Sequence, residues 1–164
     1  KIELELAAYE ELKKLPVRIP ALLGSDRTAG YLIKEYIEGE TASERLALGG
    51  VDEASIAVLL SWSAALRSAG LNIDYFPSNF VFGRGELYYI DYEINPYSEE
   101  WSFEEWGIYY WLNPSGFAIF LSTGDPAAIN LSGTGRPVWT AAAEERRIRL
   151  LSERDRRALS EGGA

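Results

Sequence analysis

The alternation of apolar and polar residues along the chain predicts helices separated by short strands. In residues 3–15, apolar side chains recur every three or four positions with Glu and Lys between them, which predicts an amphipathic helix. Residues 31–37 are rich in β-branched and aromatic side chains, so we expect a strand there. Residues 52–69 have the clearest helical period, with Asp52 as the capping residue and Gly70 directly after the helix.

A β-hairpin signal follows this helix. Residues 80–82 and 86–91 are two apolar, β-prone runs, and a glycine-bearing turn joins them. Further along, a stretch rich in aromatic residues gives way to turn-forming residues and then to charged ones. These stretches predict two buried helices broken near Asn113 and Pro114 within residues 103–121, a loop over residues 124–137, and a charged helix over residues 141–159.

Together these elements predict an α+β fold for a chain of 164 residues, 47% apolar and 25% charged, which is the composition of a soluble domain. The net charge of −9 repels polyphosphate backbones, so we expect no nucleic-acid partner. No apolar run approaches the roughly 20 residues that cross a bilayer, and the N-terminal residues lack the pattern of a signal peptide. We therefore expect no membrane association and a cytoplasmic location.

The sequence contains neither cysteine nor histidine. The first absence excludes disulfides, thiolate metal sites and cysteine nucleophiles, and the second excludes the commonest general base. Any chemistry therefore rests on carboxylates, amides and hydroxyls.

Two carboxylates and an amide flank the predicted hairpin. Asp74 and Asn79 precede its first strand, and Asp91 ends its second. Because a hairpin turns back on itself, Asn79 and Asp91 are expected at the same end of the ribbon. Phosphoryl transfer needs a carboxylate that accepts the proton of the attacking hydroxyl, and oxygen ligands that hold magnesium. These three residues could meet both needs, although Asp74 could also simply stabilise the turn before Pro77.

The order and spacing of Asp74, Asn79 and Asp91 resemble the catalytic loop, the strand pair after it and the metal-binding aspartate of protein kinases. The stretch from residue 90 to residue 93 is more similar to aminoglycoside phosphotransferases and choline kinases than to eukaryotic protein kinases. The resemblance implies that Asp74 is the catalytic residue and that Asn79 and Asp91 are metal ligands. Glu93 is either a second ligand or a solvated loop residue.

The resemblance also implies roles for residues outside the hairpin. The segment around Glu35 and Ile37 resembles the link between the two kinase lobes, which implies that the backbone of these residues contacts adenine. Lys34 stands where the family commonly has an apolar residue at the back of the nucleotide pocket, and we expect it to turn away. Glu5 resembles the helix glutamate that pairs with the nucleotide-binding lysine, with Glu3 as the alternative in register.

The resemblance covers about residues 3–112 and implies a protein-kinase-like fold, mostly its helical C-terminal lobe with a catalytic β-hairpin. Residues 1–38 would be a remnant of the small lobe with the interlobe strand, and residues 39–164 the large helical lobe. The chain contains no methionine. We therefore expect the glycine-rich loop and the nucleotide-binding lysine to be encoded upstream of Lys1.

The function that this resemblance implies is that of an ATP-dependent kinase, with ATP and Mg²⁺ as cofactors and a hydroxyl-bearing acceptor as the second partner. Only fourteen residues separate Asp91 from Trp106, without a recognisable substrate-anchoring motif of protein kinases, which favours a small-molecule acceptor. An atypical Ser/Thr protein kinase is the first alternative. A non-catalytic, kinase-derived binding module is the second, because Asn72 replaces the histidine of the family.

Two further groups of residues have an ordinary structural interpretation beside a functional one. Residues 144–157 hold six arginines against four acids, which fits an ion-paired solvated helix or, alternatively, a surface for an anionic partner. Aromatic residues cluster after the hairpin and could stack a flat substrate, but core packing is the expected role. This aromatic set comprises Tyr97, Trp101, Trp106, Tyr109, Tyr110 and Trp111.

Overall fold

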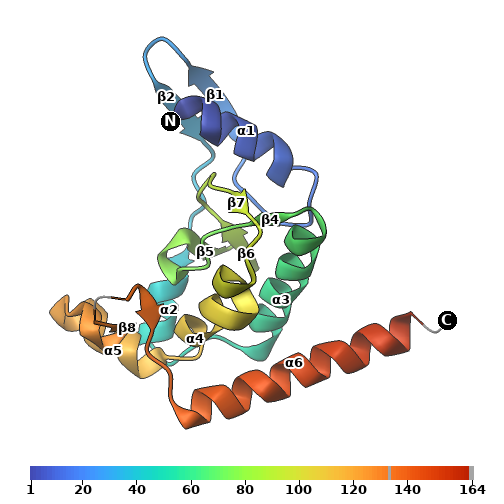
Figure 1. The fold of residues 1–164 in the computed structure, drawn as a ribbon. Coiled ribbons are helices and arrows are strands. Elements are labelled where there is room, and N and C mark those ends of the chain that lie inside the picture. The colour runs from blue at the N-terminus through green and yellow to red at the C-terminus, as the bar shows by residue number, and fades with distance from the viewer. Residues whose placement is uncertain (133, 163–164) are drawn as a thin grey trace.

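The structure is a computed structural model that describes residues 1–132 and 134–162. Helices predominate, and the strands of this part form small antiparallel sheets (Figure 1). This confirms the mixed class of helices and antiparallel strands that the sequence predicts. The helices are α1 (Ile2–Leu12), α2 (Ala42–Ala47), α3 (Glu53–Ser68), α4 (Ile108–Trp111), α5 (Pro114–Thr123) and α6 (Ala141–Glu161). The strands are β1 (Leu22–Asp26), β2 (Tyr31–Lys34), β3 (Glu40–Thr41), β4 (Leu71–Asn72), β5 (Phe80–Gly83), β6 (Glu86–Tyr89), β7 (Asn95–Pro96), β8 (Asn130–Leu131) and β9 (Arg136–Pro137).

Helix α1 and the β1–β2 hairpin stand together at one end of the molecule, at the top of Figure 1. The sequence predicts a helix over residues 3–15 and a strand over residues 31–37, and both end earlier in the structure. The strand ends at Lys34 because the chain continues from there as a linker. Strand β1 escapes sequence analysis because Gly24, Ser25 and Asp26 are typical turn residues. Pairing with β2, across a β-bulge near Gly24, makes this segment a strand.

Helix α3 forms where the apolar period predicts it, and its apolar face belongs to the main core. Asp52 Oδ1 accepts a hydrogen bond of 2.8 Å from the backbone N–H of Ser55, and this cap starts the helix. Gly70 follows the helix with φ +71°, a conformation that glycine adopts without strain. The helix buries apolar side chains on one face, namely Ile56, Leu59, Leu60, Trp62 and Leu66.

The β5–β6 hairpin forms where the sequence predicts it, with a turn of two residues, Arg84 and Gly85, because Gly83 belongs to the first strand. Arg84 and Gly85 both adopt positive φ, at 56° and 77°, which matches the twist of the flanking strands. Gly83 pairs with Glu86, and β3 adds a third strand alongside β5. The second strand ends at Tyr89, before the expected residue 91.

The C-terminal part follows the predicted order of elements. The first expected helix begins as a π-helical turn, η3 (Phe103–Gly107), which continues as α4. Asn113 caps α5, where the sequence predicts the break. The expected loop over residues 124–137 contains β8 and β9, and its residue 133 lies outside the described residues. Three short 3₁₀ turns complete the structure: η1 (Pro77–Asn79), η2 (Glu99–Trp101) and η4 (Pro126–Ala128).

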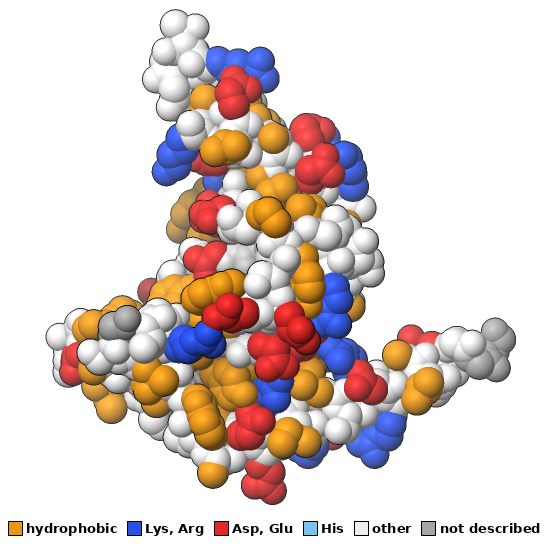
Figure 2. All heavy atoms as spheres, in the orientation of Figure 1, with side chains coloured by type: hydrophobic (Ala, Val, Ile, Leu, Met, Phe, Trp, Pro, Cys, Tyr) orange, Lys and Arg blue, Asp and Glu red, His pale blue; other side chains and the backbone are white. Residues whose placement is uncertain are grey.

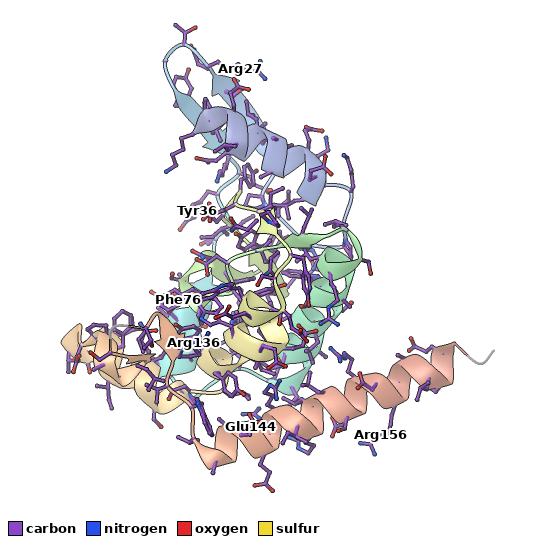
Figure 3. The ribbon with its side chains drawn as sticks, in the orientation of Figure 1. Arg27, Tyr36, Phe76, Arg136, Glu144 and Arg156 are labelled. Atoms are coloured by element: carbon purple, nitrogen blue, oxygen red, sulfur yellow. The ribbon has the colours of Figure 1, made fainter. Side chains whose placement is uncertain are left out.

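Helix α6 runs along the base of the molecule, and its C-terminal end projects beyond the body (Figure 1). Its arginines pair mainly with carboxylates of the body, so acidic and basic side chains are interspersed on the face seen in Figure 2. Arg147 pairs with Glu105, and Arg154 with the buried Glu104 over 2.8 Å. Arg156 lies on the outward side of the helix (Figure 3). Ion pairing therefore accounts for most of the arginine excess. None of the helices in the described residues has the length and apolar character needed to cross a membrane.

Candidate functional site

The candidate catalytic loop lies between α3 and the β5–β6 hairpin. Asp74 Oδ1 accepts a hydrogen bond of 2.9 Å from the backbone N–H of Phe76, which orients the carboxylate. Asn79 Nδ2 donates to the backbone oxygen of Asp74 over 3.4 Å. Because the Asn79 amide directs its nitrogen at Asp74, its Oδ1 atom can bind a cation. The loop thus brings Asp74 and Asn79 together.

Asn79 and Asp91 lie at the same end of the hairpin. Asn79 directly precedes β5. The backbone N–H of Ile90, the residue before Asp91, donates to the carbonyl oxygen of Asn79 over 2.9 Å. An amide oxygen and a carboxylate are hard donors, and Mg²⁺ commonly takes one or two such ligands from a protein when phosphates complete its coordination. The donor set therefore fits magnesium. Within residues 1–132 and 134–162, no group of three or more acidic, His or Cys side chains could hold a metal by itself.

Burial is the main influence on the ionisation of Asp74. Removal from water raises the pKa of its carboxyl above the ordinary value, against the hydrogen bonds from Phe76 and Asn79, which lower it. The negative charges of Glu93 and Asp91 raise the pKa further. A carboxylate with a raised pKa takes up a proton more readily. The surroundings of Asp74 are therefore suited to a proton acceptor.

A hollow of about 400 Å³ opens beside Asp74. Its walls include the carboxylates of Asp74 and Glu93 and the indoles of Trp101 and Trp106, whose ring centroids are 5.6 Å apart. Carboxylates and indole faces both attract cations. A second hollow, of about 380 Å³, is lined by Glu93, Asp91 and residues of α1. Glu93 therefore faces both hollows.

Asn72 anchors the segment that forms one wall of the first hollow. Its side chain is buried, at 4% exposure, and Nδ2 donates to the backbone oxygens of Trp101 over 2.9 Å and Ser98 over 3.4 Å. Backbone pairing of Asn72 with Asn95 joins β4 to β7. The anchoring role of Asn72 is not evident from the sequence, because its partners lie 26 and 29 residues away.

The linker after β2 buries Ile37 and exposes Tyr36. Glu35 pairs with Arg84 of the hairpin turn over 2.8 Å, and Ile37 packs in a small apolar cluster with Val81 and Tyr88. In the part of the chain that the structure describes, no hydrogen bond engages the carbonyl oxygen of Glu35 or the N–H of Ile37. Ile37 as a whole is buried, at 5% exposure. Tyr36, between Glu35 and Ile37, is 82% exposed (Figure 3).

Glu5 faces the candidate site from α1. It forms an ion pair with Lys34, with 3.6 Å between Glu5 Oε2 and Lys34 Nζ. The Lys34 ammonium also lies 3.8 Å from the ring centroid of Tyr92, and Lys34 is not among the residues that line the hollows beside Asp74 and Asp91. The alternative, Glu3, pairs with Arg27 at the exposed β1–β2 turn. Of the two glutamates, only Glu5 lines the hollow that contains Asp91.

The aromatic residues serve the core, the hollow or, for Trp106, both. Tyr110 and Trp111 are buried in the main core, and Trp111 Nε1 donates to the backbone oxygen of Tyr75 over 2.8 Å. Core packing is therefore confirmed for these two residues. Trp101 and Trp106 line the hollow beside Asp74, so their indoles are placed to contact a ligand.

No protein-family model matches the chain, and no curated protein matches its sequence significantly.

Proposed function

We propose that the chain is the larger part of an ATP-dependent phosphotransferase of kinase-like fold, which uses Mg²⁺ to phosphorylate the hydroxyl of a small acceptor. The observation that carries this proposal is the arrangement of Asp74, Asn79 and Asp91 at one end of the β5–β6 hairpin. The division into a small-lobe remnant, residues 1–38, and a large lobe, residues 39–164, belongs to the same proposal.

In the proposed reaction, Asp74 accepts the proton of the acceptor hydroxyl. The hydroxyl oxygen forms a bond to the γ-phosphorus of ATP while the bond from that phosphorus to the bridging oxygen breaks, and ADP leaves. Asn79 and Asp91 would hold Mg²⁺, which supplies positive charge to the phosphates. The raised pKa of Asp74, caused by burial, supports its role as the base.

Nucleotide binding would use the linker and α1. The carbonyl oxygen of Glu35 and the N–H of Ile37 would pair with the base, and Glu5 would hold the phosphate-binding cation. The hydrogen-bonding groups of the linker that are left without partners support this role.

The hollow beside Asp74 supports a small acceptor that carries a positive charge. Two carboxylates and two indoles line a space of about 400 Å³, which suits an amino-alcohol or amino-sugar better than a protein segment. An atypical Ser/Thr protein kinase is the second candidate enzyme. A non-catalytic binding module is the rival of another class, and Asn72 in place of the histidine of the family favours it.

The test is ATP consumption by the full-length protein with amino-alcohol, sugar and protein acceptors, measured beside nucleotide affinity. Asp74→Asn should keep nucleotide affinity and lower turnover by about 10²–10⁴-fold. Asp91→Ala should remove most of the stabilisation by Mg-ATP, which is about 2.7 kcal/mol at a hundredfold excess over Kd. Asp155→Asn, on the exposed end of α6, is the control.

Each outcome separates the candidates. Turnover that Asp74→Asn leaves unchanged would contradict the mechanism. A wild-type protein that binds nucleotide and phosphorylates none of the acceptors would support the binding module. Equal stabilisation of wild type and Asp91→Ala by Mg-ATP would exclude Asp91 as a magnesium ligand.

A further inference from the structure

A groove of about 690 Å³ lies between α3 and the C-terminal half of α6, the part of that helix that projects beyond the body (Figure 1). The α3 side of the groove carries a stripe of small residues, Ala54, Ala57, Ser61 and Ala64. They are spaced three or four positions apart, so they share one face of the helix. Small side chains at a contact let a second helix approach closely. The stripe can therefore pack against another helix.

The α6 side of the groove carries a row of charges that alternate in sign. Arg149, Glu153, Arg157 and Glu161 follow one another at intervals of four residues, and the last three line the groove. Arg149 and Glu153 pair with each other over 3.1 Å. Within residues 1–132 and 134–162, no ion pair engages Arg157 or Glu161. The half of the row on the projecting end thus presents both charges to the solvent.

This row is complementary to its own reverse. From its N-terminal end it reads positive, negative, positive, negative, and from its C-terminal end every sign is inverted. An antiparallel second α6 therefore sets Arg149 against Glu161 and Glu153 against Arg157. A two-fold axis through the pair makes each of these contacts twice. A parallel pair in register would instead set like charges against each other. The charge pattern therefore fits a second copy of this chain in the antiparallel direction.

Leu159 needs cover that the single chain does not give it. Its side chain is 78% exposed, and the helical period places it on the far side of α6 from Arg157, two residues earlier. When each α6 lies between the α6 and the α3 of the other copy, its charged row faces the other α6. Leu159 then faces the stripe of small residues on the other α3, and burial of this apolar surface favours association.

We propose that the chain forms a two-fold symmetric dimer in which the C-terminal half of each α6 docks into the α3–α6 groove of the other copy. The inference does not depend on the proposed function, because none of the residues that carry it belongs to the candidate site. Its partner is fixed by the charge row, which only the same helix in the reverse direction matches at every position.

The test is the dimer Kd of the full-length protein, measured by sedimentation velocity between about 1 and 100 μM. Arg157→Glu sets two glutamates against each other at each contact with position 153, and Glu153→Arg sets two arginines there. Because like charges face each other twice in a symmetric dimer, each variant should raise the Kd by at least about tenfold. Circular dichroism checks that both variants fold.

An equal mixture of Arg157→Glu and Glu153→Arg gives the most specific result. In a dimer with one chain of each kind, both contacts between positions 153 and 157 again join opposite charges. The mixture should therefore recover a Kd within about threefold of wild type. A change in the stability of α6 itself cannot produce this recovery, because each chain carries the same substitution in the mixture as it does alone.

Two further variants test the groove and the location of the charge. Ser61→Trp places a large side chain in the groove from an exposed position on α3, and it should raise the Kd by at least about tenfold. Arg27→Glu makes the same change of charge as Arg157→Glu at the other end of the molecule (Figure 3). Arg27 pairs with Glu3 at the β1–β2 turn, so this variant should leave the Kd unchanged.

Dimerisation of wild type and of the mixture, weakened in each single variant and in Ser61→Trp, would support the inference. A wild type that stays monomeric over the whole concentration range would overturn it. So would a mixture that associates no better than its two components, because the charge rows would then not be in contact. A dimer that Ser61→Trp leaves intact would show that the helices meet outside the groove, which also contradicts the docking.

Discussion

Gly107 lies so close to Tyr75 that no further carbon atom fits between them. A Cβ atom on Gly107 would stand 2.5 Å from the Cβ of Tyr75 and 2.9 Å from Cδ2 of Phe103. Gly107 ends the π-helical turn η3, and Tyr75 follows Asp74 in the candidate catalytic loop. The contact therefore determines how closely the helix approaches that loop.

Gly107→Ala should destabilise the protein. In a helix, alanine is ordinarily more favourable than glycine by about 1 kcal/mol. Here the added methyl group would overlap buried atoms, and such overpacking costs typically 1–3 kcal/mol. The free energy of unfolding, measured by urea denaturation, should therefore fall by about 1–3 kcal/mol.

Gly24→Ala is the matched control for Gly107→Ala. A Cβ atom on Gly24 would meet only the Cδ1 atom of Ile33, at 3.8 Å, which is an ordinary contact. The stability of this variant should change by less than about 1 kcal/mol. An increase in stability of Gly107→Ala would mean that helix and loop do not approach so closely in solution.

The cap of α3 makes a pH-dependent contribution to stability. Asp52 Oδ1 accepts hydrogen bonds from the hydroxyl and the backbone N–H of Ser55, and both lower the pKa of Asp52 below its usual 3.8. Because the folded state favours the ionised form, this stabilisation is present above the unfolded pKa and is lost as the pH falls through the lowered folded pKa. Asp52→Ala should therefore cost about 1 kcal/mol at neutral pH and progressively less in acid.

Asp52→Asn separates the charge from the cap. Asparagine is also a good capping residue, so this variant should lose little stability at neutral pH, and position 52 should no longer contribute a pH dependence. Urea denaturation at about pH 7 and about pH 3 provides the comparison. A cost of Asp52→Ala that is the same at both pH values would show that the carboxylate charge does not contribute.

The elements that the sequence predicts correctly are those whose signals are local. Asp52 and Gly70 mark the ends of α3 because capping and glycine conformation involve only neighbouring residues. The segment that forms β1 is not predictable in this way. Its Gly24, Ser25 and Asp26 favour turns, and only hydrogen bonds to β2 make them a strand.

The same distinction applies to the candidate site. Asn79 and Asp91 are predictable neighbours because a single hairpin separates them. The direction of Lys34 is not, because its contacts with Glu5 and Tyr92 depend on how α1 and the segment after the hairpin pack around β2. A pattern of residue types along the chain contains no information on such packing.

Substitutions of Asn72 test whether the site needs a proton carrier or only a hydrogen-bond donor at this position. Its buried amide holds the backbone oxygens of Trp101 and Ser98, which belong to the wall beside Asp74. Asn72→Leu keeps a similar size and removes the donor, so these oxygens lose a partner. Leaving a buried polar group unsatisfied costs about 1–3 kcal/mol, and we expect this loss of stability together with a lower turnover.

Asn72→His is the informative companion variant, because histidine retains an N–H donor and restores the residue found in the kinase families that the chain resembles. If donation is all that the site requires, wild type and Asn72→His should turn over ATP at rates within about tenfold of each other, while Asn72→Leu is slower. Both rates are measured with the acceptor that wild type uses best. An inactive wild type that becomes active as Asn72→His would show that Asn72 silences the site, and the binding module would then be the better account of the natural protein. Full activity of Asn72→Leu would contradict the anchoring role, because the segment beside Asp74 would then be held in place without this amide.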